Sequence, residues 1–309
     1  MILHTGLRTD IPAFYSRWFM NRVRAGSVLV RSPYAAHSVL RYRISPDVVD
    51  LISFCTKNPE PMLPHLEELR DYAMFWFVTI TPYGEEIEPN VPEKVKVLQS
   101  FRRLSDALGP TCVAWRYDPI LLTAEYTEQR HIEEFARMAR SLRGYTDTCV
   151  ISFVDLYKKV QRNFPHCREV PPDARLRLGA EMVRIAAENG MTLKTCAEGD
   201  LLAQCGADTR GCMTVETYEK AIGETLAPPK KTAGRKECAC YLGADIGAYD
   251  TCGHLCLYCY ANSNAAAVRR NIAAHDPDSP LLCGAIEPED QISDAQQKSW
   301  RTGQIRLSL

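Results

Sequence analysis

The feature that most constrains the fold is a regular alternation between two hydrophobic patterns along the chain. Short apolar runs typical of strands, such as 74–80 and 111–115, alternate with stretches whose apolar residues recur at helical spacing, such as 92–108 and 128–142. About seven strand-then-helix units follow one another in this way. Repeated βα units build a parallel sheet covered by helices, so we expect an α/β fold, specifically a TIM-like (β/α) barrel that is fully or partly closed.

The remaining expected elements continue the same pattern. We expect a short helix to begin at Pro46, because Ser45 is a suitable N-cap and proline suits the first helical turn. The other expected strands and helices, read from the same two periods, lie at 2–5, 14–23, 28–30, 51–55, 63–69, 149–154, 173–189, 192–195 and 265–274.

The chain has 309 residues, a usual size for one such barrel. We predict a barrel body over 1–227 and a cysteine-rich, cluster-binding segment over 228–275 that packs on the barrel. A linker-like stretch, PPKKTAGRK at 228–236, leads into that segment, and a polar C-terminal extension covers 276–309.

Bulk composition is that of a globular protein, with 46% apolar residues and a net charge of −1. The balance of 37 basic and 38 acidic side chains gives no independent support for a nucleic-acid partner. No apolar run reaches about 18 residues and no secretory leader is visible, so we expect a cytoplasmic protein without a membrane partner.

Cysteine usage points to metal chemistry. Five of the thirteen cysteines lie within 238–262, and an odd number without secretory context argues against a disulfide framework. Cys252, Cys256 and Cys259 have the spacing C-x3-C-x2-C, with Tyr258 before the last. Thiolates this close can hold an iron–sulfur centre or zinc, and three ligands leave one position open. We expect His254, inside the motif, to be an exposed loop residue without a metal role.

Four further cysteines suggest a second site. Cys196, Cys212, Cys238 and Cys240 come from separate predicted loops, and four thiolates would close an auxiliary [4Fe–4S] or structural zinc site. Cys205 is a substitute ligand. The alternative is that Cys196 merely ends a buried strand while the other cysteines are loop residues, or that Cys238 and Cys240 join Cys252 and Cys256 in a zinc knot.

Polar residues recur just after the predicted strands, where a parallel barrel builds its active site. The alternative interpretation is that they form structural salt bridges and turns. Arg8, Lys57 and Arg116 are candidates to hold a carboxylate or phosphate, and Asp118 and Glu198 to hold ribose hydroxyls or a substrate amine. The whole set comprises Arg8, Asp10, Arg31, Lys57, Asn58, Thr81, Tyr83, Arg116, Asp118, Asp155 and Glu198.

The stretch DIGAYDTCGHLCLYCYAN resembles the radical S-adenosylmethionine (SAM) enzymes, whose signature is C-x3-C-x2-C with an aromatic residue before the third cysteine. The stretches RTDIPAFYSRWFMNR, TKNPEP, FVTITPYGEEIEPNVP, WRYDPI and TCAE resemble an uncharacterised bacterial family, a domain of unknown function, with spore photoproduct lyase as the nearest named relative. This resemblance implies that three thiolates hold a [4Fe–4S] cluster, that SAM completes its coordination, and that cleaved SAM removes hydrogen from a substrate.

The same resemblance implies the partners and further roles. It implies a small-molecule or nucleotide substrate, or a nucleic acid, and an electron donor such as flavodoxin or ferredoxin. Tyr258 is expected to pack beside the cluster, and Tyr260 follows it. Asn58 and Thr81 lie in the segments 56–59 and 81–83, the candidates to replace the Gly-Gly-Glu segment that usually binds the SAM amino group and is absent here.

A second departure concerns order along the chain. Radical SAM enzymes normally carry the cysteine triplet after their first strand, whereas here it follows all the predicted strands, as in a circularly permuted barrel. The alternative function is a non-catalytic iron–sulfur or zinc protein with a role in electron transfer, regulation or structure.

Overall fold

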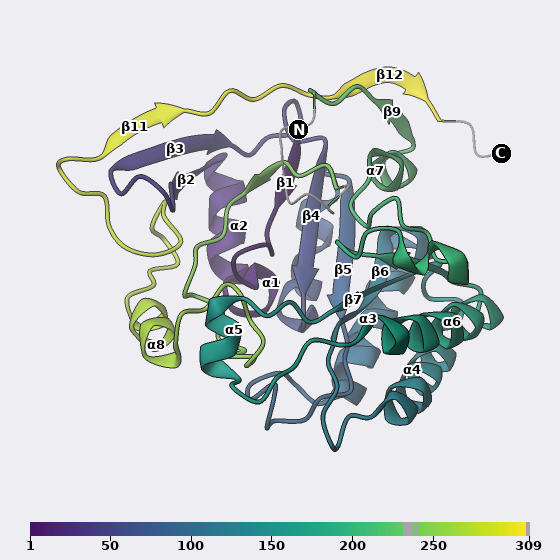
Figure 1. Ribbon diagram of the computed structural model, residues 1–309. Coiled ribbons are helices and arrows are strands. Elements are labelled where there is room, and N and C mark those ends of the chain that lie inside the picture. Colours follow the sequence, from purple (N-terminus) through teal and green to yellow (C-terminus); the bar gives the residue numbers. More distant parts are fainter. Residues whose placement is uncertain (231–237, 239, 307–309) are drawn as a thin grey trace.

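The computed structural model describes residues 1–230, 238 and 240–306 and is built around one parallel sheet. Figure 1 shows this sheet at the centre of the molecule, with the helices outside it. Its seven strands lie in the order β10 (Ala244–Asp245), β1 (Ile2–His4), β4 (Leu51–Thr56), β5 (Met74–Thr79), β6 (Val113–Ile120), β7 (Thr148–Phe153) and β8 (Thr192–Thr195). Every neighbouring pair is parallel.

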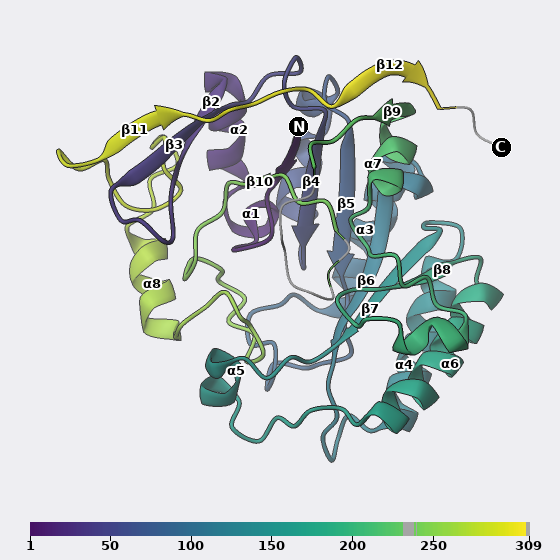
Figure 2. The same cartoon turned by 45° about the horizontal axis from the view of Figure 1, so that its top comes forward.

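The strands of this sheet lie in the order in which they occur along the chain, apart from β10. It is the last of them in the sequence but lies at the edge next to β1. Figure 2 shows β10 on the outer side of β1. Because the order never reverses from β1 to β8, right-handed connections place the helices on one face, as in a barrel rather than a doubly wound sheet. No pairing joins β8 to β10 among the described residues, so the sheet is open there.

Five α-helices among the described residues follow β5 and precede β10. They are α3 (Lys94–Leu108), α4 (Glu128–Leu142), α5 (Lys158–Asn163), α6 (Pro172–Glu188) and α7 (Val215–Ile222). The sequence pattern predicts α3, α4 and α6 but not α5 and α7. In α4, the Thr127 side chain caps the helix by accepting a hydrogen bond from the backbone N–H of Arg130 at 3.2 Å. The shorter α1 (Ile11–Phe14) and α2 (Ser16–Ala25) follow β1, and α8 (Ala265–Ala273) follows the cysteine-rich segment.

Register divides the central sheet into two unlike faces, since successive side chains alternate between them. One face is apolar and packs on the helices: Phe54 stacks on Trp76 at 4.0 Å, and Trp115 stacks on Phe135 of α4 at 4.7 Å. The other, which we call the polar face, carries four side chains whose register places them together, namely His4, Cys55, Arg116 and Lys194. These polar and reactive side chains of the central strands therefore lie on the same side of the sheet.

Two small sheets lie beside the central one. β11 (Gln291–Asp294), β3 (Ser38–Arg43) and β2 (Ser27–Arg31) form the first, and β12 (Arg301–Ile305) pairs with β9 (Glu224–Leu226) in the second. Figure 1 shows the C-terminal segment, in yellow, crossing the end of the molecule where the strands begin. In agreement, the backbone N–H of Trp300 donates to Asp50, just before β4, at 2.7 Å.

Several expected elements differ from those observed. The expected strand at 28–30 exists but belongs to the first small sheet, so Arg31 pairs with Asp290 and lies away from the rim of the central sheet. The expected helix at Pro46 is a turn, and 63–69 falls in two 3-10 helices, Glu60–His65 and Glu67–Leu69, where Pro64 limits α-helix formation. Two other 3-10 segments occur, Pro110–Cys112 and Leu201–Cys205.

The linker predicted at 228–236 lies mostly outside the described residues, and the three predicted segments of the chain remain predictions. None of the described helices is both long and apolar enough to cross a membrane.

Candidate metal centre

The cysteine loop, residues 250–262, follows β10 directly and therefore lies where the strands of the central sheet end. It carries Cys252, Cys256 and Cys259, which we call the loop thiols. Cys256 is buried and the other two are half-buried. Asp250 and Leu255 both have φ near +57°, an arrangement that few non-glycine residues adopt and that tends to occur at functional sites.

Hydrogen bonds fix this loop to segments far away in the sequence. Tyr15 donates to the carbonyl of Thr251 at 2.6 Å, and the Asn90 side chain donates to the carbonyl of Gly253 at 2.8 Å. Gly253 lies so close to α1 that a Cβ there would be 2.7 Å from the Phe14 ring. The loop is thus held against α1 and the segment after β5, both of which are distant from it in the sequence.

His254 is a correction to the sequence analysis, because it is buried rather than exposed. Only 2% of its surface is accessible. Its Nε2 lies 2.9 Å from the Asp10 carboxylate and its Nδ1 lies 3.2 Å from the carbonyl of Asn90. Asp10 also accepts from the backbone N–H groups of Ala13 and Lys57, at 3.0 and 2.7 Å. Asp10 and His254 therefore join β1, β4 and the cysteine loop.

Glu88 is the centre of a buried ionic cluster beside the loop thiols, and the sequence analysis missed it. Lys57 reaches its carboxylate at 2.8 Å and Lys94 also pairs with it. Thr81 donates to the same carboxylate at 2.6 Å, and so does the hydroxyl of Tyr258. Burial alone would raise the pKa of Glu88, but the two lysines lower it to about 2, so the group is a carboxylate.

Burial keeps the loop thiols in their neutral form, because it raises the pKa of each of them. Burial raises the pKa of Cys252 well above its ordinary value, and the charges of Cys259, Asp10 and Cys256 raise it further. Burial likewise raises the pKa of Cys256 to about 12, with Lys57 opposing the rise. Three thiols that resist ionisation together would lose their protons when a positively charged centre binds all of them.

Spacing of the sulfur atoms bears on which metal fits. A single zinc ion binds sulfur at about 2.3 Å, which puts tetrahedral sulfurs about 3.8 Å apart. In the part of the chain that the structure describes, the three metal-ligating side chains whose donor atoms all lie within 4.8 Å of one another are His37, Glu287 and Asp290. The cysteines form no such set, and this wider spacing suits thiolates that each bind a different iron of one cluster.

The group of His37, Glu287 and Asp290 has a simpler explanation than a metal. The His37 and Glu287 side chains are more than half exposed, and Asp290 already pairs with Arg31. It lies on the small sheet, away from the cysteines.

The four cysteines of the predicted second site come together, and we call them the polar-face thiols. The sulfurs of Cys212 and Cys240 are 3.5 Å apart. The side chains of Cys196 and Cys238 lie within electrostatic range of this pair. Because Cys240 contacts Cys212 rather than a sulfur of the cysteine loop, the arrangement does not favour the alternative zinc knot. Cys205 contacts the carbonyl of Leu176 instead.

Arg116 and Asp118 lie between the two thiol groups. They were expected just after a strand, whereas β6 continues through them to Ile120. The Arg116 guanidinium donates to Asp118 at 2.9 Å and to the Cys212 sulfur at 3.6 Å. Asp118 also accepts from Ser152, and the Arg116 charge helps to lower its pKa against the opposing effect of burial. This pair is therefore in contact with the polar-face thiols.

The other predicted site residues lie around this centre with partners of their own. Arg8 pairs with Asp245 of β10, and Glu198 accepts from Arg175 at 3.1 Å. Burial raises the pKa of Glu198 to about 7. The half-buried Asn58 accepts from the backbone N–H of Glu60 at 3.3 Å, and the exposed Tyr260 donates to the carbonyl of Leu7. Lys57 and Asp10 are the predicted polar residues whose charges act on the loop thiols, while Thr81 and Tyr258 join the cluster around Glu88.

One family description matches residues 2–261, namely "Domain of unknown function (DUF1848)". The chain belongs to this family. The match covers every predicted site residue and ends within the cysteine loop, after Cys259. No curated protein matches the sequence. The family assignment therefore agrees with the uncharacterised family expected from the sequence.

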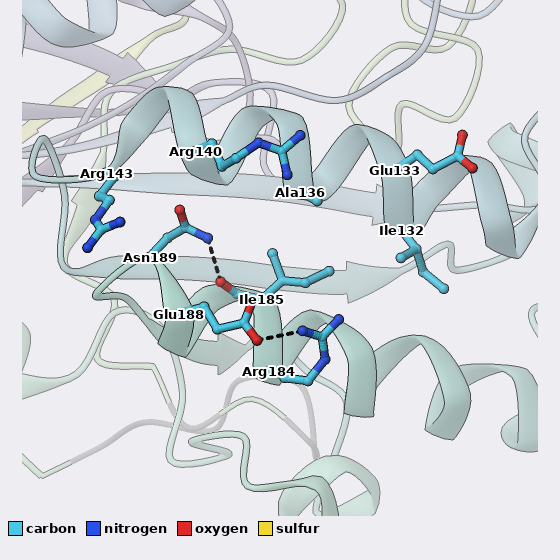
Figure 3. Close-up of a pocket in the computed structure, with 9 residues that line it drawn as sticks. All are labelled: Ile132, Glu133, Ala136, Arg140, Arg143, Arg184, Ile185, Glu188 and Asn189. Carbon is cyan, nitrogen blue, oxygen red and sulfur yellow. Dashed lines mark hydrogen bonds and ion pairs between the residues drawn. The ribbon is translucent and has the colours of Figure 1, made fainter.

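The groove in Figure 3 is separate from both thiol groups. It has a volume of about 590 Å³ and lies between α4 and α6, where Arg140 and Arg184 are among its lining residues. Arg184 pairs with Glu188 across one helical turn at 2.6 Å. The lining includes none of the cysteines and none of the polar residues at the strand ends, so it has no part in the candidate site.

Proposed function

We propose that the protein is a radical SAM-type enzyme in which Cys252, Cys256 and Cys259 hold a [4Fe–4S] cluster that binds SAM. The observation that carries the proposal is the position of β10. Among the strands of the central sheet, β10 comes last along the chain but lies at the first edge position, and the cysteine loop begins a few residues after it. A strand that leads the sheet and is followed by C-x3-C-x2-C is the arrangement of radical SAM enzymes, here reached by a permuted chain.

The residues of the loop fit such a cluster. The three thiols act on one another electrostatically, and they do not all lie as close together as the ligands of a single ion would. A bound metal centre would take up their thiolate forms and release their protons. Three ligands leave one iron for SAM. When bound, the cluster and SAM together supply one-electron cleavage of SAM and removal of a hydrogen atom from a substrate.

The side chains of the chain itself provide orientation and charge. The Glu88 carboxylate fixes the Tyr258 hydroxyl and the Lys57 ammonium, so the side of the loop that faces β4 and β5 is rigid. The Lys57 ammonium lies 5.6 Å from the centre of the Tyr258 ring, and its charge bears on Cys256. Lys57 is thus the cation that we assign to the SAM carboxylate, with Thr81 and Asn58 on neighbouring strand ends.

The substrate side of the site lies across the sheet, toward β6, β7 and β8. Arg116 and Asp118 are buried together, and Glu198 lies within electrostatic range of Asp118. A carboxyl group with a pKa of about 7 can either donate or accept a proton near neutral pH. We assign these groups to a small-molecule or nucleotide substrate, with a nucleic acid as the other candidate, and a flavodoxin or ferredoxin as electron donor.

Anaerobic reconstitution with iron and sulfide, followed by EPR of the reduced protein with and without SAM, tests the proposal. We expect a cluster signal that changes when SAM is added, together with release of 5′-deoxyadenosine and methionine. Cys256→Ala should abolish the SAM-dependent change in the signal and the release of 5′-deoxyadenosine, whereas Cys112→Ala, outside either thiol group, should abolish neither.

The alternative function predicts a different result. An iron–sulfur protein without catalysis would give a cluster signal that SAM leaves unchanged and no 5′-deoxyadenosine. A zinc protein would contain zinc as purified and take up no iron. Either outcome would overturn the radical SAM assignment while leaving the fold and family membership intact.

A further inference from the structure

We propose that Cys196, Cys212, Cys238 and Cys240 bind a second iron–sulfur cluster on the polar face of the sheet, and that His4 supplies an N–H group to it. This site is independent of the loop thiols and of the proposed SAM chemistry. It is carried by three separate observations on the described residues, namely the sulfur contacts, the N–H groups that already face the sulfurs, and an unpartnered buried imidazole.

One sulfur contact is direct, and the other two thiols lie close to it. The sulfurs of Cys212 and Cys240 are 3.5 Å apart, and the side chains of Cys196 and Cys238 lie within electrostatic range of this pair. These residues come from the end of β8, from the turn before α7 and from the segment before β10. Convergence of four thiols from three segments is the usual construction of a closed thiolate site.

The spread of the four sulfurs favours a cluster over a single zinc ion. Tetrahedral zinc needs each sulfur about 3.8 Å from the other three. The Cys212–Cys240 distance meets that need, but among the described residues no three cysteines belong to a set whose donor atoms all lie within 4.8 Å. Four sulfurs that are not all this close to one another surround more space than one ion fills.

Two N–H groups already point at these sulfurs. The Arg116 guanidinium donates to Cys212 at 3.6 Å, and the backbone N–H of Met213 donates to Cys240 at 3.4 Å. Hydrogen bonds of this kind stabilise thiolate charge and help to set the reduction potential of a cluster. The polar-face thiols therefore already have N–H donors that could stabilise thiolate charge, which neutral cysteines in an apolar core would not need.

His4 is the observation that points most directly to a ligand. It is 1% exposed, and neither of its ring nitrogens has a hydrogen-bond partner among the described residues. Such an unsatisfied buried group is costly and calls for an explanation. His4 lies on the polar face in register with Ser53, and Cys240 is the charged group that acts on it. Its ring also lies 6.4 Å from that of Tyr218, which faces the same thiols.

A full-chain variant without the loop thiols isolates the second site. In Cys252→Ala/Cys256→Ala/Cys259→Ala, anaerobic reconstitution with iron and sulfide should leave about four iron and four sulfide per chain. Adding Cys212→Ala and Cys240→Ala should remove this iron. Adding Cys112→Ala and Cys167→Ala, a matched pair outside both groups, should leave it. Circular dichroism checks that each variant folds.

Either of two results would overturn the second cluster. One is no iron uptake by the folded triple variant, and the other is one zinc per chain that excludes iron. Because the triple variant lacks the loop thiols, its result does not depend on SAM cleavage. A wild type that cleaves SAM beside an iron-free triple variant would reject the second site alone, and the reverse outcome would reject the proposed function alone.

The role of His4 is tested by reduction potential in the same triple variant. His4→Leu should leave the iron content unchanged and make the midpoint potential more negative, because a hydrogen bond to the cluster is lost. His4→Gln keeps an N–H donor of similar reach and should restore part of the shift. Equal potentials in all three proteins, or loss of iron in His4→Leu, would refute the assigned role.

Discussion

The loop thiols and the polar-face thiols are assembled in opposite ways. The first group comes from eight consecutive positions after one strand, 252–259, and is enclosed by a dense ionic cluster around Glu88. The second is gathered from three segments, 196, 212 and 238–240, and is supported by one guanidinium and one backbone N–H. Thiols that share one loop need neighbouring side chains to hold that loop in place. Thiols that come from separate segments are positioned by the packing of those segments in the fold.

The largest expected effect removes the charge that supports the loop thiols. Glu88→Gln leaves the buried Lys57 and Lys94 without their carboxylate, and we expect a loss of about 3–5 kcal/mol in the free energy of unfolding. Urea unfolding at pH 7 measures it. Asp118→Asn, which leaves one cation unpaired beside the polar-face thiols, should cost less. An equal or larger loss in Asp118→Asn would contradict the contrast between the two supports.

A pH effect of about 3 kcal/mol should come from the apolar face, away from both thiol groups. His131 is buried; its Nδ1 lies 2.8 Å from the Tyr117 hydroxyl and its Nε2 lies 2.8 Å from the carbonyl of Leu121. Burial lowers its pKa from 6.5 to about 4, so the folded state favours the neutral ring. Its contribution is complete above pH 6.5 and is lost as the pH falls toward 4.

Unfolding free energies at pH 7 and pH 4.5 measure this loss. Burial also lowers the pKa of His4 to about 4, so wild type loses stability through both residues. The difference between wild type and His131→Gln isolates His131, and the variant should show the smaller decline. An identical decline in the two proteins would show that His131 contributes nothing.

A smaller effect should follow from crowding under the cysteine loop. Gly253→Ala puts a methyl group 2.7 Å from the Phe14 ring, and the resulting displacement should cost about 1–3 kcal/mol. The iron bound through the loop thiols should fall, while the iron of the polar-face thiols should not. Combining Gly253→Ala with Phe14→Ala, which removes the ring, should restore the iron content. No rescue in the double variant would mean that the crowding is not the cause.

The smallest effect concerns one hydrogen bond at the edge of the loop. Tyr260→Phe removes the hydroxyl that donates to the carbonyl of Leu7, on a ring that is 47% exposed. We expect a loss of about 1 kcal/mol and unchanged iron content, because water can replace the hydroxyl. Loss of a SAM-dependent EPR change in this variant would instead place Tyr260 at the cofactor.

The sequence predicts the elements whose signal is local. The helix at 128–142 has the predicted bounds, and the apolar run at 74–80 forms β5. The C-x3-C-x2-C spacing identifies the loop thiols as a group because all three lie within one short stretch, while their binding of a metal stays a prediction. The open edge between β8 and β10 could not be predicted. Whether these two strands meet depends on the number of strands and on the curvature of the whole sheet, which no local pattern gives.

Contacts between distant segments could not be predicted from local patterns. Glu88 lies in the stretch EEIEP with two other glutamates, and nothing in that stretch identifies it as the one that accepts two lysines. His254 was expected to be an exposed loop residue, but α1 and the segment after β5 cover it. The pairing of Arg31 with Asp290 likewise depends on a strand 260 residues later, β11.

The late position of β10 has a consequence for biogenesis. During synthesis β1 emerges first, but its outer edge stays without a neighbour until residues 244 and 245 have left the ribosome. Cys196 and Cys212 emerge earlier, whereas every other thiol of the two groups emerges between residues 238 and 259. Docking of β10 on β1 and assembly of both thiol groups would then occur at nearly the same stage of synthesis, after most of the sheet has formed.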